Sequence, residues 1–75
     1  MLNLSNIKKN KTYKITGYSD ELPIKIVRRL CDLGLTKGES VALGGRSLLK
    51  KAMLIEVRGY LLSLKTDIAK GVMVQ

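Results

Sequence analysis

The segment 28–41 constrains the fold more than any other part of this chain. Glycine is favoured just after a helix, where the backbone turns left-handed. If Gly34 takes that position, Leu35 should pack its side chain back onto Leu30, one turn inside the helix. Gly38 then supplies a second turn with positive φ. These fourteen residues therefore predict a helix end, a turn and the start of a strand.

The helix before Gly34 is expected to run from Leu22 or Pro23 to Leu33. Proline and acidic residues are typical of a helix start, and Asp20–Glu21 and Pro23 stand at that end of the segment. The sequence predicts that these residues belong to the helix N-terminus.

The apolar residues of this helix cover an arc of about 180°, wider than the stripe of about 100° that a surface helix needs. One shoulder of the arc is formed by Ile24, Val27 and Cys31. Either the fold buries the helix deeply, which we favour, or this shoulder forms a contact between copies of the chain. A lone cysteine on the apolar side of a helix is expected to act as a small hydrophobic residue.

Alternating and apolar runs separated by turn residues predict five strands. They cover residues 11–18, 40–43, 52–58, 61–64 and 72–74. Gly44–Gly45 is expected to end the second strand and Gly59–Tyr60 to form a turn. Residues 66–70 should form one helical turn capped by Thr66 or Asp67. The pattern predicts one mainly β domain over residues 1–75, a small five-stranded barrel with a helix inserted after the first strand.

Charge and composition restrict the function. Fourteen basic and six acidic residues give a net charge of +8, which suits an anionic partner such as nucleic acid, a membrane surface or an acidic protein. The chain has no histidine, one cysteine and scattered carboxylates, so it lacks a recognisable catalytic pair and a ligand set for a tight metal site. We therefore expect no enzyme activity, no cofactor and no resident metal, although carboxylates could hold adventitious ions.

Two further expectations concern partners and location. Three tyrosines without Phe or Trp offer little surface for stacking bases, so nucleic-acid binding is an alternative and not the leading hypothesis. No uncharged apolar run reaches the length of about 18 residues that a membrane span needs. A cytoplasmic protein is expected, with peripheral association at the inner face of the membrane left open.

Residues 29–38, which read Arg-Leu-Cys-Asp-Leu-Gly-Leu-Thr-Lys-Gly, are similar to the central motif of the FeoA family, the small cytosolic component of bacterial ferrous iron uptake. Two other segments resemble the family's opening and closing parts: residues 4–11, and residues 57–59 with Leu64, Ala69 and Val74. Asn10 stands where the family usually has glycine, and asparagine enters the left-handed region more easily than most residues. Residues 46–52 lack the proline-containing turn often seen in the family.

The resemblance implies an SH3-like barrel and an accessory or adapter role, exerted by contact with FeoB, the membrane iron transporter with a GTPase domain. The same type of domain occurs as the C-terminal module of metal-dependent repressors. A free-standing relative of that module is therefore a second alternative.

The contact surface is expected at the loop between the second and third strands. Successive side chains of an extended segment point to opposite sides, so at least one of Leu48 and Leu49 should be exposed. The basic residues expected to surround them, from the loop and from the neighbouring helix face, are Arg46, Lys50, Lys51, Arg28 and Arg29. The alternative is a loop folded over the barrel, with both leucines in the core.

Overall fold

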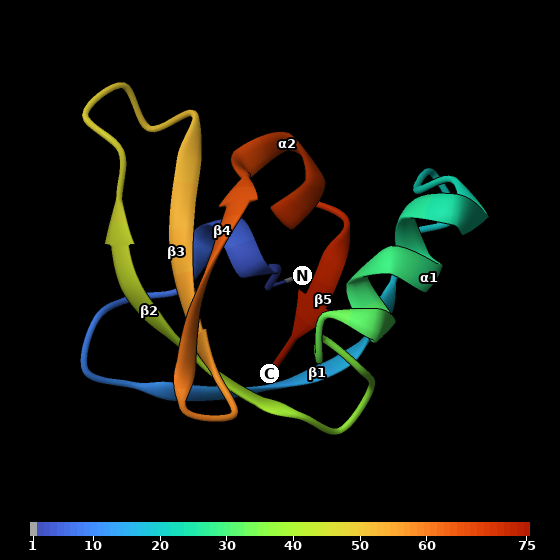
Figure 1. The fold of residues 1–75 in the computed structure, drawn as a ribbon, viewed down its shortest axis with the longest axis horizontal. Helices are drawn as coiled ribbons and strands as arrows, with labels where there is room; N and C mark the ends of the chain where they lie inside the picture. Colours follow the sequence, from blue (N-terminus) through green and yellow to red (C-terminus); the bar gives the residue numbers. More distant parts are fainter. Residues whose placement is uncertain (1) are drawn as a thin grey trace.

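A computed structural model of the protein describes residues 2–75 (Figure 1). Within this range the strands form one antiparallel sheet in the order β4-β3-β2-β1-β5. In chain order the elements are the 3-10 helix η1 (Leu4–Asn6), β1 (Thr12–Tyr18), α1 (Ile24–Asp32), β2 (Ser40–Arg46), β3 (Ala52–Val57), β4 (Tyr60–Lys65), α2 (Thr66–Ala69) and β5 (Val72–Val74). The mainly β fold with a helix after the first strand is confirmed.

The sheet curls because β1 takes part in two ladders. The first half of β1 pairs with β2, from Thr12 to Lys14, and the second half pairs with β5, from Ile15 to Tyr18. The register shifts between Ile15 and Gly17, as at a β-bulge, which bends a strand. Figure 1 shows α2 bridging the two edge strands, β4 and β5, at one end of the curled sheet.

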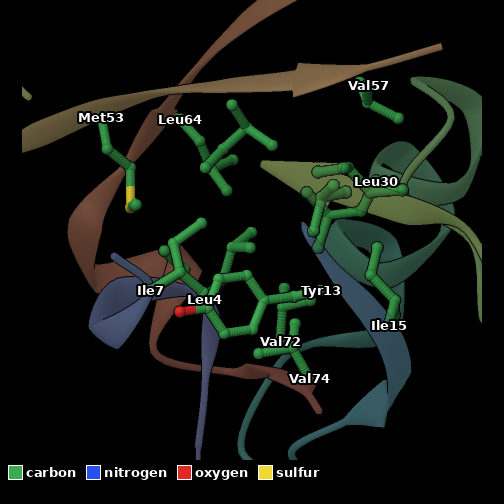
Figure 2. Close-up of a cluster of buried hydrophobic side chains, with 14 residues drawn as sticks. Leu4, Ile7, Tyr13, Ile15, Leu30, Met53, Val57, Leu64, Val72 and Val74 are labelled. Atoms are coloured by element: carbon green, nitrogen blue, oxygen red, sulfur yellow. The ribbon is translucent and has the colours of Figure 1, made fainter. Parts of the chain in front are cut away.

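The core lies inside this curl. Met53, Ile55 and Val57 on β3 are at most 1% exposed, as their alternation with polar residues predicts. The N-terminal segment also contributes Leu4 and Ile7, which are buried and which the residue pattern did not predict as core. Figure 2 shows these two residues beside the ring of Tyr13. The core is therefore closed by a segment that precedes the first strand.

The helix end matches the prediction. Gly34 has φ +100°, and its N–H donates to the Cys31 oxygen at 3.0 Å. The Leu35 N–H donates to the Leu30 oxygen at 2.9 Å, and both leucine side chains are buried. These two hydrogen bonds define a Schellman motif, in which a left-handed residue ends the helix. Gly38 has φ +92°, so the second expected turn is also confirmed.

The helix start and the depth of its burial differ from the prediction. The helix begins at Ile24, after Pro23 as the N-cap, and no acidic residue lies in its first turn. Leu30 is the one residue of α1 that is buried, and Ile24 is 63% exposed. The helix is therefore not deeply enclosed. It packs beside the sheet through a narrow stripe of side chains.

One strand end and one turn also differ from the prediction. β2 continues through Gly44 and Gly45 to Arg46, and the pair marks a register shift and not a strand end. The β3–β4 hairpin turns at Arg58 and Gly59, which have φ +51° and +85°, the signs that a type I′ turn requires. Tyr60 accordingly belongs to β4.

No side chain caps α2, contrary to expectation. The Thr66 hydroxyl instead donates to the Lys50 oxygen at 2.8 Å, which ties α2 to the β2–β3 loop. Asn10 has φ +65°, so this asparagine does occupy the left-handed conformation expected at its position.

Candidate functional site

The loop between β2 and β3, residues 47–51, presents its two leucines to solvent. Leu48 is 98% exposed and Leu49 is 74% exposed. The Ser47 hydroxyl accepts hydrogen bonds from the N–H groups of Lys51 and Ala52, both at 3.1 Å. The exposure predicted for at least one leucine is confirmed, and the alternative of a loop folded over the core is wrong.

Lysines gather beside this loop. They surround a hollow of about 640 Å³ between the loop and α2, lined by Lys50, Lys51, Ala52, Lys65, Thr66, Asp67 and Lys70. Strand pairing places Lys65 opposite Ala52, next to the loop. Lys65 and Lys70 were not predicted for this surface. They lie at least fourteen residues beyond Lys51, and only the strand pairing and α2 bring them back to the loop.

Arg46 was expected beside the leucines; it is exposed, but its side chain is bonded to the N-terminal segment. Its guanidinium donates from Nη2 to the main-chain oxygens of Ser5, at 3.1 Å, and of Ile7, at 3.0 Å. The side chain therefore holds the N-terminal segment against β2.

Arg28 and Arg29 lie on α1, away from the β2–β3 loop, so the structure does not bring them to the leucines (Figure 1). Arg29 instead borders a second hollow, of about 370 Å³, between α1 and β4. The apolar residues lining this groove are Ile26, Leu30, Leu33, Leu62, Leu64 and Ile68. Its basic rim is formed by Arg29 and Lys65. We call this the α1–β4 groove.

The groove follows from the way α1 ends. The Tyr60 hydroxyl donates to the main-chain oxygen of Leu33, the C-cap of α1. The β3–β4 hairpin thus holds the end of the helix beside β4, while the rest of the apolar arc stays partly exposed. Helical periodicity predicted the wide apolar arc, but not which strand it would face.

The shoulder of α1 that was expected to contact another copy of the chain is partly exposed. Ile24 is exposed, and Val27 and Cys31 are half-buried. The Cys31 sulfur lies 3.4 Å from the Tyr18 hydroxyl, which donates to the Leu35 oxygen at 2.5 Å. Burial, together with the nearby Cys31, raises the pKa of Tyr18 above its ordinary value. A contact between copies through this shoulder stays a prediction.

Residues 2–75 contain no group of three or more His, Cys, Asp or Glu side chains placed to hold a metal ion. No helix in this range has the length and apolar character needed to cross a bilayer.

A family model described as the FeoA domain matches residues 2–75. The chain belongs to the FeoA family. The family resemblance found in residues 29–38 and in the opening and closing segments is thereby confirmed. FeoA domains are small accessory components associated with ferrous iron transport.

Solved structures of FeoA proteins are similar to this FeoA-family chain over nearly its whole length. The FeoA protein of Chlorobium tepidum is 26% identical with a TM-score of 0.88, covering 99% of this chain and 69% of that one. A FeoA-like protein of Clostridium acetobutylicum is also 26% identical, with a TM-score of 0.84, covering 99% and 84% of the two chains.

The FeoA of Stenotrophomonas maltophilia, solved in complex with zinc, is 26% identical with a TM-score of 0.78, covering 100% of this chain and 91% of that one. It is described as a prokaryotic SH3 domain protein and suggested to be a ferrous iron transport activating factor. The SH3-like fold expected for this FeoA-family chain is confirmed.

Longer metal-binding or metal-regulatory proteins share the fold. ScaR with bound cadmium is 23% identical with a TM-score of 0.83, and the match covers 100% of this chain but 35% of ScaR. The manganese regulator SloR is 16% identical with a TM-score of 0.79, and the match covers 97% of this chain but 33% of SloR. At these identities the likeness concerns the fold alone. A comparison with curated proteins finds no match.

Proposed function

We propose that this FeoA-family chain is a cytoplasmic accessory protein of ferrous iron uptake that acts by binding the GTPase-bearing transporter FeoB and not by catalysis. The observation that carries the proposal is the α1–β4 groove. It is an apolar hollow with basic residues at its rim, and such a surface suits an apolar protein segment flanked by acidic residues.

The groove supports this role better than the β2–β3 loop does. A concave apolar surface can bury an anchor side chain of a partner, and buried anchors carry most of the energy of an interface. The loop is convex at its tip, and its expected extension to Arg28 and Arg29 is absent because α1 lies away from the loop (Figure 1). Arg29 belongs to the groove rim instead.

Nucleic-acid binding has little support among the aromatic residues. Tyr13 is 9% exposed in the core and Tyr18 is half-buried, which leaves Tyr60, at 42%, as the one exposed tyrosine of the chain. A platform for stacked bases needs free aromatic faces. A role as a free-standing relative of a repressor module rests on the shared fold alone.

The test is co-purification of this chain with the cytosolic GTPase domain of FeoB. Leu62→Ser removes an apolar side chain from the groove and should weaken binding roughly tenfold or more. Leu61→Ser is the matched control, since Leu61 precedes it on β4, does not line the groove and is 57% exposed. Thermal melts of both variants must show folded protein.

A charge reversal provides a second arm that does not disturb the core. Arg29→Glu, at the groove rim, should reduce binding, while Lys25→Glu, exposed on the same helix, should not. The double change Leu48→Ser, Leu49→Ser tests the loop originally expected to contact FeoB. Loss of binding in this loop variant alone would transfer the contact to the loop, and full binding by every variant would reject both surfaces.

A further inference from the structure

The tip of the β2–β3 loop carries two leucines that are not part of the core. Leu48 and Leu49 are 98% and 74% exposed, and Figure 1 shows the loop projecting beyond the body of the sheet. The Lys50 N–H donates to the Ser47 oxygen at 2.9 Å, and Lys50 has φ +59°. The loop is therefore a defined turn that holds two leucines in water.

Positive charge lies next to this tip, on the side that faces α2. Four lysines and one aspartate line the adjacent hollow, which gives a local net charge of 4 − 1 = +3. The aspartate is Asp67, whose Oδ1 lies 3.8 Å from Lys70 Nζ, and both side chains are largely exposed. We call this surface the loop end and define it as Leu48, Leu49, Lys50, Lys51, Lys65 and Lys70.

The loop end is a single unit because α2 is bonded to the loop. The Thr66 hydroxyl donates to the Lys50 oxygen at 2.8 Å, and the Thr66 N–H donates to the Lys51 oxygen at 2.9 Å. These bonds keep α2, with Lys65 and Lys70, beside Lys50 and Lys51, which follow the leucines in the loop. Apolar tips and basic side chains are thus presented together at one end of the molecule.

We propose that the loop end docks on the surface of an anionic lipid bilayer, with Leu48 and Leu49 inserted at the interface. Exposed leucines gain from entering the acyl boundary, and lysines are attracted to anionic headgroups while their alkyl stems lie along the apolar region. A convex apolar tip suits a fluid surface, which needs no complementary pocket.

The choice of basic residue supports lipid over a protein partner. Arginine is the residue that recognises carboxylates in bidentate fashion, whereas lysine acts as a point charge. Every basic side chain of the loop end is lysine, and Arg46, which precedes the loop, is bonded to Ser5 and Ile7. A free polyphosphate would explain the lysines but would leave the two leucines without a role.

The experiment is flotation of the isolated chain with vesicles. It should bind vesicles that mix phosphatidylserine with phosphatidylcholine, bind much less to phosphatidylcholine alone, and be partly released by high salt. The double change Leu48→Ser, Leu49→Ser should reduce binding roughly tenfold or more. Lys50→Gln with Lys51→Gln should reduce it about fivefold for each lysine.

Matched controls distinguish binding through the loop end from binding that depends only on net charge or on exposed apolar surface. Lys8→Gln with Lys9→Gln removes another exposed lysine pair, and Leu61→Ser removes an exposed leucine from β4, so both should bind as the unchanged chain does. Equal binding to neutral vesicles, or equal effects of the loop and control variants, would overturn the proposal. So would binding of single-stranded oligonucleotide that depends on the same lysines if the vesicles were not bound. Because FeoB is absent from this assay, its outcome is independent of the groove proposal.

Discussion

Arg46 donates a hydrogen bond to the main-chain oxygen of Ile7, 39 residues earlier in the chain, at 3.0 Å. Ile7 is 1% exposed, so this bond fixes the backbone next to a core side chain. The same guanidinium also reaches the Ser5 oxygen. A residue that the sequence placed on a partner surface therefore attaches the N-terminal segment to the sheet.

Arg46→Gln should lower the free energy of unfolding by about 1 kcal/mol, because two charge-assisted bonds at a partly exposed site are lost or weakened. Lys11→Gln, an exposed change of the same charge, should have almost no effect. Urea unfolding checks both. If Arg46→Gln unfolds at the same urea concentration as the unchanged chain, the guanidinium does not hold the N-terminal segment.

Gly34→Val should destabilise the protein by more than about 1 kcal/mol, because a β-branched residue is strained at φ +100°. A Cβ at this position would also lie 3.3 Å from Arg58 Cδ. Gly17→Val is the matched control: its Cβ would meet nothing within 4 Å, and valine is favoured in strands. Thermal melts that show equal losses for the two variants would contradict the role assigned to Gly34.

Ionisation of Tyr18 should lower the free energy of unfolding at alkaline pH. Its pKa is raised in the folded protein by burial and by Cys31, so the unfolded chain loses this proton first. The stabilisation is complete below the ordinary pKa of 10.0 and decreases as pH rises from there towards the raised value. The slope attributable to Tyr18 should be at most about 1.4 kcal/mol per pH unit.

Tyr18→Phe tests this directly. The variant should be less stable near neutral pH, by about 1 kcal/mol, because the Leu35 oxygen loses its hydroxyl donor. Above pH 10 its stability should fall less steeply than that of the unchanged chain. Parallel curves for the two proteins would show that Tyr18 titrates normally.

The purified protein should retain far less than about one iron per chain after dialysis against a chelator. Residues 2–75 bring no three His, Cys, Asp or Glu side chains together, and a tight ferrous site needs such a set. Elemental analysis before and after dialysis is the measurement. Stoichiometric iron that survives the chelator would require a ligand set that these residues do not form.

The sequence by itself determined the features that depend on near neighbours. The bonds from Gly34 and Leu35 back to the helix span three to five residues, so the residue types at those positions were sufficient to predict them. The buried face of β3 likewise follows from strict alternation, because side chains of a strand point to opposite sides. Asn10 in the left-handed region is a third local case.

Only the tertiary structure decided which distant residues share a surface. Periodicity showed the width of the apolar arc on α1, but its neighbour was set by Tyr60, which holds the Leu33 end beside β4. Lys65 lies next to the β2–β3 loop because it pairs opposite Ala52. Arg46, which precedes that loop, instead donates a hydrogen bond to the Ile7 oxygen. Such contacts join residues far apart in the chain, so they depend on strand order and sheet curvature, which no local pattern of residues encodes.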